Sequence, residues 1–160
     1  MSRYNKVILT LLVLCSLALG TTKVFESDTF WHIKLGQEIL KSLSLPVAVP
    51  FAFTGEGVPW IATEWLSEVV FFILYSVGGS SGLILLNAVV LALCTLLVYG
   101  SLRAHNCYST LSFIISLLWA VMSRDWFVER PHIFSILCMC YYLYYLSRLK
   151  SIFVFPIVMI

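Results

Sequence analysis

The chain has 160 residues, of which 61% are hydrophobic and only 11% are charged, and its mean hydropathy is +0.97. Ordinary soluble domains carry about 25% charged residues, so this composition excludes a soluble globular domain and indicates an integral membrane protein. The formal charge is +2 and no run of lysines and arginines occurs, which excludes nucleic-acid binding through a basic tract. At about 20 residues per crossing, the chain has room for four membrane-spanning helices and one large loop.

The first apolar segment follows Arg3 and Lys6, and two interpretations of it stay open. Residues 7–20 have the basic flank and the small terminal residues of a secretory signal peptide. The apolar stretch can also continue over 7–25, with Lys23 extending to the interface, and then it is long enough to span the membrane. We expect the retained helix.

Residues 26–80 form the most polar part of the chain. Their acidic residues are Glu26, Asp28, Glu38, Glu56, Glu64 and Glu68. Residues 28–43 place apolar side chains, Leu40 and Leu43 among them, on one side of a helical wheel, which predicts an amphipathic helix on the membrane surface. Prolines and glycines interrupt residues 45–59 and predict an irregular loop. A second helix is predicted over 64–77, ending at Gly78–Gly79 and too short to span, so we expect it at the interface.

Further spans are predicted over 82–102, 109–123 and 131–147, and a fifth apolar stretch begins at residue 151. This arrangement places every carboxylate on one side and, on the other side, Arg3, Lys6, Arg103, Arg148 and Lys150. Because lysine and arginine are enriched on the cytoplasmic side, we expect a multi-pass protein of the cell's inner membrane with a cytoplasmic N-terminus. The predicted fold class is all-α: a single membrane domain over 1–160 with about four transmembrane helices, and two interfacial helices in the external loop 26–80.

The cysteines predict neither a disulfide framework nor a metal site. Four of the five lie in apolar stretches, and Cys107 alone lies in a polar loop, which we expect to be cytoplasmic. Cys138 and Cys140 are two residues apart, so on a helix their thiols point to different sides and cannot share an ion.

Several short motifs follow one another in the chain: Asp28 to His32, Gly36, Pro50–Phe51, Trp60, Glu64 to Leu66, Gly78–Gly79 and Arg130 to His132. In these motifs, over about residues 26–135, the chain resembles uncharacterised bacterial membrane proteins related to GT-C-type glycosyltransferases. The resemblance implies transfer of a sugar from a polyprenyl-phosphate carrier to an acceptor at the outer surface of the membrane. It also implies an acidic residue near the start of the first external loop that acts as a base or binds a metal.

The resemblance assigns roles to individual residues. Asp28 matches the acidic position and is the candidate catalytic base, because an acceptor hydroxyl loses its proton during transfer. Arg130 is the first candidate for binding the carrier phosphate, followed by Arg124. The remaining candidates for substrate binding are Glu26, His32 and Glu64.

The chain also departs from better-known members of that group. They often have two adjacent acids at the first motif, whereas Thr29 follows Asp28 here, so a divalent metal stays an open alternative and no metal ligand is assigned. Folds of this type have at least seven spans, and the chain ends at Ile160 within an apolar run. We therefore expect an N-terminal piece that is inactive alone.

Each candidate residue also has a structural interpretation. Asp28 is suited to the N-terminus of a helix, where the helix dipole favours a carboxylate. His32 lies among apolar residues and is typical of a hydrogen-bonded packing histidine. Glu64 and Glu68, four residues apart, either share a cation, bind the acceptor or form a solvated stripe on an interfacial helix.

Two other classes of function compete with sugar transfer. A transporter would place charges inside its spans, and here the charges avoid the interiors of the predicted spans. A non-catalytic membrane assembly protein is the stronger rival, and it would tolerate loss of Asp28. The transferase hypothesis further predicts that Asp28, Arg130 and Glu26 lie together at the outer mouth of the bundle. Pairing of Arg130 with Glu129 or Asp125 is the local alternative.

Overall fold

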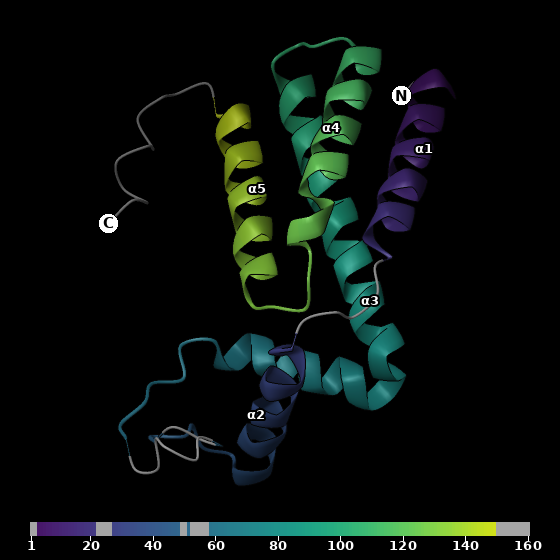
Figure 1. Ribbon diagram of the computed structural model, residues 1–160. Coiled ribbons are helices and arrows are strands. Elements are labelled where there is room, and N and C mark those ends of the chain that lie inside the picture. The colour runs from purple at the N-terminus through teal and green to yellow at the C-terminus, as the bar shows by residue number, and fades with distance from the viewer. Residues whose placement is uncertain (1–2, 22–26, 49–50, 52–57, 150–160) are drawn as a thin grey trace.

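The computed structural model describes residues 3–21, 27–48, 51 and 58–149, and the named secondary-structure elements in these residues are all helices (Figure 1). The helices are α1 (Arg3–Gly20), α2 (Thr29–Ser42), α3 (Trp65–Ala104), α4 (Ser109–Ser123), a short 3-10 helix η1 (Arg124–Trp126) and α5 (His132–Arg148). The predicted all-α class is confirmed. The fifth apolar stretch, which was predicted from residue 151, lies outside the described residues.

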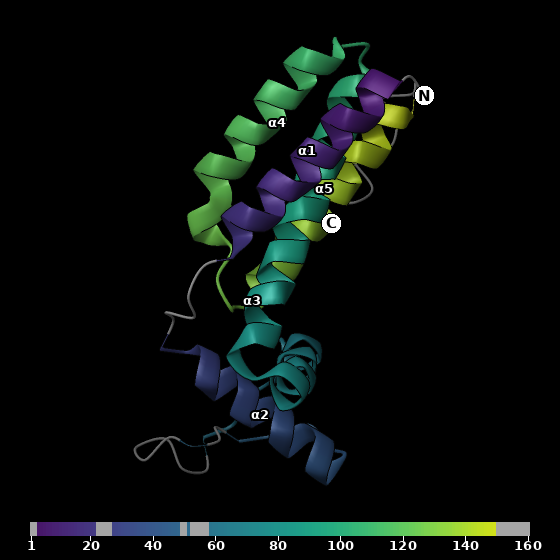
Figure 2. The same cartoon turned by 90° about the vertical axis from the view of Figure 1, so that its right-hand side faces the viewer.

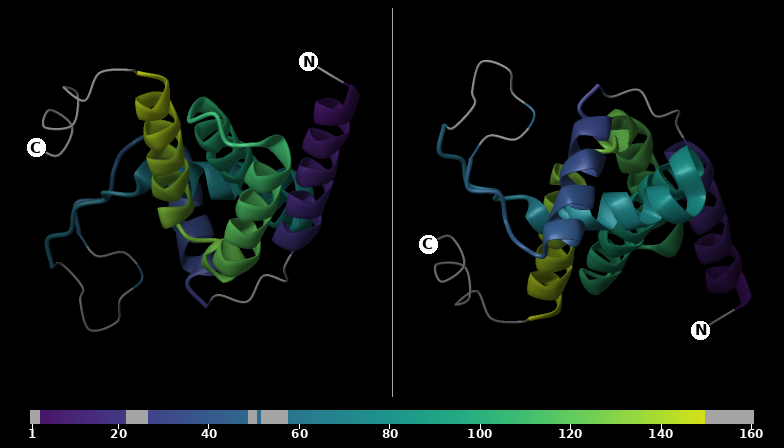
Figure 3. Two further views of the ribbon diagram at one scale, coloured as in Figure 1. Left: turned by 90° about the horizontal axis from the view of Figure 1, so that it is seen from above. Right: turned by 90° about the horizontal axis from the view of Figure 1, so that it is seen from below.

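The helix α3 organises the molecule because α1, α2, α4 and α5 all pack against it. Its second half runs alongside α1, α4 and α5 and forms a bundle with them, whereas its first half lies across one end of this bundle (Figures 1 and 2). Seen from below, α2 crosses the first half of α3 on the side away from the bundle (Figure 3). We call this the α2 end of the molecule.

The bend in α3 occurs at Gly79, where the backbone leaves the helical conformation with φ 55° and ψ −145°. Residues with a Cβ atom rarely adopt this combination, and glycine adopts it freely. The two helices predicted over 64–77 and 82–102 are therefore the two halves of α3, and the predicted break at Gly78–Gly79 is confirmed.

Two helices, α1 with 18 residues and α3 with 40, are long and apolar enough to cross a membrane. The helices α4 and α5 are shorter, with 15 and 17 residues. Four spans were predicted from the sequence, and two helices, α1 and α3, meet the requirements of length and hydropathy. The first span was predicted over 7–25, but α1 ends at Gly20 and residues 22–26 lie outside the described part.

Large apolar side chains are exposed along every helix of the bundle. Examples are Val7, Leu11, Leu14, Leu85, Leu93, Leu111, Leu118, Val121, Met139 and Leu143. Beneath them the core joins α3 to its neighbours through buried residues such as Phe71, Leu91 and Ile133.

The amphipathic character predicted for residues 28–43 is confirmed in part. Ile33, Leu35 and Ile39 are buried on one face of α2, and this face packs against α3. Leu40 and Leu43 were predicted to share that face, yet they are 39% and 87% exposed. Leu43 leaves the face because α2 ends at Ser42 and Leu43 turns into a left-handed conformation with φ 50°.

Candidate functional site at the α2 end

An ion pair joins the start of α2 to the start of α5. The Arg130 guanidinium donates from Nη2 to Asp28 Oδ2 at 2.8 Å, and the two side chains are 42% and 56% exposed. The two residues that the sequence predicted to meet are therefore in contact, although 102 positions separate them. Glu26, the third member of the predicted group, lies outside the described residues.

The residues named in the local alternatives also have contacts of their own. Asp28 occupies the N-cap position of α2, as its structural interpretation expected, and its side chain makes no cap hydrogen bond. Asp125, one proposed local partner for Arg130, forms an exposed ion pair with Arg124 at 3.2 Å. Glu129, the other, is 1% exposed and accepts a hydrogen bond from another helix.

A second charged contact links α2 to α3. His32 Nδ1 lies 3.2 Å from Glu68 Oε1, and the two residues are 8% and 1% exposed. Gly36 lies one turn beyond His32, and a Cβ atom there would collide with the Glu68 carbonyl oxygen. The absence of a side chain at Gly36 thus lets α2 approach α3 closely enough to enclose Glu68. This contact agrees with the interpretation of His32 as a hydrogen-bonded packing histidine. The interpretation of Glu68 as part of a solvated stripe is wrong, because Glu68 is buried.

Glu64 completes a group of three at this crossing. It is exposed at the N-cap of α3, and one donor atom each from His32, Glu64 and Glu68 lie within 4.8 Å of one another. This group could hold a metal ion. The sequence analysis considered Glu64 and Glu68 as a pair, but it did not add His32, because the pairing of helix faces is not visible in local periodicity.

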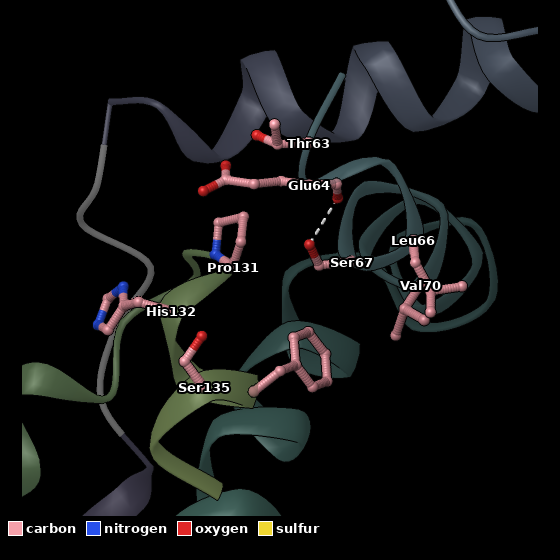
Figure 4. Close-up of a pocket in the computed structure, with 9 residues that line it drawn as sticks. Thr63, Glu64, Leu66, Ser67, Val70, Pro131, His132 and Ser135 are labelled. Carbon is pink, nitrogen blue, oxygen red and sulfur yellow. Dashed lines mark hydrogen bonds between the residues drawn. The ribbon is translucent and has the colours of Figure 1, made fainter. Parts of the chain in front are cut away.

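An open pocket of about 420 Å³ lies between the first turns of α3 and the start of α5 (Figure 4). Its lining residues are Thr63, Glu64, Leu66, Ser67, Val70, Pro131, His132, Phe134 and Ser135. Glu64 extends over Pro131 in this view, and the Ser67 hydroxyl donates to the Glu64 carbonyl oxygen at 2.6 Å. His132 Nε2 lies 2.7 Å from the Trp126 carbonyl oxygen.

Arg130 lines a second hollow, of about 490 Å³, together with Asp125, Trp126, Val128 and His132. Because His132 lines both hollows, they adjoin each other at the start of α5. The exposed guanidinium of Arg130 is therefore accessible to a ligand in the second hollow, while Glu64 is accessible to one in the first.

One polar contact at this end was not predicted. Asn87 is fully buried in the second half of α3, and its Nδ2 donates to Glu129 Oε1 at 2.8 Å. Glu129 lies in the loop before α5, as expected, and from there it contacts a residue of the stretch predicted as a span. The available signal was Asn87 itself, the one amide side chain within the apolar stretch 82–102.

Comparisons with protein-family models, with curated proteins and with solved structures find no match for this chain. Geometry and chemistry are therefore the basis for the roles of the residues at the α2 end.

Proposed function

We propose that this chain carries the donor-binding and proton-accepting groups of a membrane glycosyltransferase, which uses a polyprenyl-phosphate sugar at the outer face of the inner membrane. The observation that carries the proposal is the ion pair between Arg130 and Asp28 at 2.8 Å. It brings a phosphate-binding group and a candidate base to one exposed position beside two adjoining hollows.

The chemistry of the two side chains suits this reaction. A guanidinium binds a phosphate through two parallel N–H donors, which fixes the orientation of the carrier. When Arg130 turns from the carboxylate to the carrier phosphate, Asp28 becomes available to the acceptor. The acceptor oxygen then bonds to the anomeric carbon, the bond from that carbon to the phosphate oxygen breaks, and the hydroxyl proton passes to Asp28.

Placement in the membrane is part of the same proposal. The helix α4 is about 22 Å long and α5 about 25 Å at 1.5 Å per residue, close to the roughly 30 Å of a bilayer core, and both expose large apolar side chains. We place α1, the second half of α3, α4 and α5 across the bilayer as four spans.

The distribution of charge supports one orientation. Arg3, Lys6, Arg103 and Arg148 lie near the end of the bundle opposite α2 (Figure 1). The six carboxylates of the described residues lie at the α2 end, namely Asp28, Glu38, Glu64, Glu68, Asp125 and Glu129, and four basic residues lie with them: Lys34, Lys41, Arg124 and Arg130. The opposite end has basic residues and no carboxylate among the described residues, so we place it, with the N-terminus, in the cytoplasm and the site outside.

Binding of the carrier phosphate provides the first test. Purified protein in phosphatidylcholine nanodiscs is titrated with undecaprenyl phosphate, and binding is followed by native mass spectrometry. We expect Arg130→Lys to weaken binding because it loses the two-pronged guanidinium contact, and Arg130→Ala to weaken it by at least about tenfold. Arg124→Lys is the matched control, since Arg124 pairs with Asp125 and not with Asp28. Equal binding by wild type and Arg130→Ala would overturn the proposal.

Asp28→Asn tests the proposed base. In a protein that transfers sugar from a radiolabelled polyprenyl-phosphate hexose, this change removes the proton acceptor while retaining the size of the side chain. Transfer should be lost, while membrane insertion and carrier binding persist. Undiminished transfer by Asp28→Asn would eliminate the catalytic role.

A non-catalytic assembly protein is the second candidate, and the same ion pair favours it. Asp28 and Arg130 fasten the first loop to the start of α5 whether or not a substrate binds. This alternative predicts that Asp28→Asn lowers the melting temperature slightly, because exposed ion pairs contribute about 0–1 kcal/mol, and that Arg130→Ala leaves carrier binding unchanged.

A further inference from the structure

We propose that His32, Glu64 and Glu68 form a binding site for one borderline divalent cation, Zn²⁺ or Mn²⁺, at the crossing of α2 and α3. The inference goes beyond the proposed sugar transfer and does not depend on it. The site uses neither Asp28 nor Arg130, and its occupant is identified by the chemistry of three donors.

The distances fit a single coordination sphere. Imidazole nitrogens and carboxylate oxygens bind Zn²⁺ at about 2.0–2.2 Å, which places neighbouring donors of one ion about 3.0–3.4 Å apart. His32 Nδ1 and Glu68 Oε1 are 3.2 Å apart, and all three donor atoms lie within 4.8 Å of one another. A rotation of the exposed Glu64 side chain brings its carboxylate closer without movement of a helix.

Glu68 supplies an independent indication of a ligand. Its side chain is 1% exposed, and Oε2 has no hydrogen-bond partner among the described residues. A buried carboxylate oxygen without a partner costs about 1–3 kcal/mol or more, so natural proteins rarely keep one. A cation that both oxygens of the Glu68 carboxylate bind would satisfy this oxygen.

The donor set selects the class of cation. Mg²⁺ and Ca²⁺ prefer oxygen ligands, whereas one imidazole with two carboxylates suits Zn²⁺ or Mn²⁺. Three protein ligands leave coordination positions for water or a substrate oxygen, and Glu64 faces the 420 Å³ pocket. The ion would therefore be accessible from the pocket, and it would also join α2 to α3.

Mn²⁺ is the probe for the test, because its free form gives an electron paramagnetic resonance signal that disappears on binding. The full chain, purified in detergent and stripped with chelator, is titrated with Mn²⁺. We expect one ion per chain and displacement by Zn²⁺, which binds a given site more tightly. Glu64→Gln and Glu68→Gln should each weaken Mn²⁺ binding by at least about tenfold, since each removes a charged ligand.

Glu38→Gln is the matched control, because Glu38 is an exposed carboxylate on α2 that pairs with Lys34 at 3.2 Å. Its Mn²⁺ binding should equal that of the wild type. Glu64→Gln keeps the result interpretable, since this residue is exposed and its replacement leaves the helix content, measured by circular dichroism, unchanged. Wild-type protein that binds no Mn²⁺, or binding that Glu64→Gln leaves intact, would overturn the inference. Either result leaves the undecaprenyl phosphate test unaffected, so the two proposals can fail separately.

Discussion

Two carboxylates and one amide side chain are enclosed near the α2 end of the bundle. Glu68, Asn87 and Glu129 are each at most 1% exposed, and each belongs to a contact between different parts of the chain. Enclosing such groups is costly unless they are hydrogen-bonded, so their partners are as important to the fold as the apolar core. Glu68 depends on His32, and Glu129 on Asn87.

Replacement of Asn87 tests this dependence. Asn87→Ala removes the donor to Glu129 and leaves a buried carboxylate with one hydrogen bond fewer, so it should lower the free energy of unfolding by about 1–3 kcal/mol. Thermal unfolding in detergent, followed by tryptophan fluorescence, measures the change. Ser101→Ala is the control, because the Ser101 hydroxyl only donates to a carbonyl oxygen of its own helix. Equal melting temperatures for the two variants would contradict the role given to Asn87.

At the scale of elements, two glycines determine the direction of α3 and its contact with α2. Gly79 bends α3, so that its first half lies across the end of the bundle while its second half runs through the bundle. Gly36 lets α2 approach the backbone of α3 at Glu68. The candidate metal group exists because both conditions hold: the first half of α3 is turned outward, and α2 packs closely upon it.

A side chain at residue 79 should destabilise the bend. Gly79→Ala must adopt φ 55° and ψ −145°, which costs a residue with a Cβ atom about 1–3 kcal/mol. Gly78 offers a neighbouring control, since it lacks a positive φ and a Cβ there meets no atom within 4 Å. Gly78→Ala should change stability by less than about 1 kcal/mol and in the stabilising direction. Thermal unfolding compares the two, and equal stability would show that the bend tolerates alanine.

Gly36→Ala tests the crossing of α2 and α3. Its Cβ would collide with the Glu68 carbonyl oxygen, which belongs to a helix and cannot move aside alone. We expect α2 to shift and the free energy of unfolding to fall by about 1–3 kcal/mol. The tryptophan emission should also change, because the ring of Trp31 on α2 packs edge-on against that of Trp60, with 5.7 Å between the ring centroids. Emission and melting temperature like those of the wild type would mean that the helices accommodate the methyl group.

At the scale of the whole molecule, the two ends of the bundle differ in charge. The carboxylates of the described residues lie at the α2 end together with Lys34, Lys41, Arg124 and Arg130, whereas the opposite end has Arg3, Lys6, Arg103 and Arg148 and no described carboxylate. In the orientation that we propose, the α2 end is outside, and the loop between α3 and α4, which contains Cys107, is cytoplasmic.

Labelling with a membrane-impermeant thiol reagent tests this orientation. In a chain whose other cysteines are replaced by alanine, Cys107 should react only after the cells are permeabilised. A cysteine introduced at Val47, which is 82% exposed at the α2 end, should react in intact cells once Cys107 is also replaced. Modification of Cys107 in intact cells would contradict this orientation and indicate the opposite one.

The sequence by itself determined the helical class, the two helices of the polar loop and the break at Gly78–Gly79. These features depend on composition, periodicity and glycine, all of which act locally. It also predicted the meeting of Asp28 with Arg130, because two residues at the mouths of spans on one membrane side lie at the same depth.

Only the tertiary structure decided which helix faces meet. Burial of Glu68 against His32 follows from the close crossing at Gly36, and the contact of Asn87 with Glu129 follows from how α3 packs near the start of α5. Leu43, apolar and in phase with the buried face, is exposed because α2 ends one residue earlier. Helical periodicity gives the direction of each side chain within its own helix, but the partner of a buried polar group depends on the relative rotation and separation of two helices, which packing alone determines.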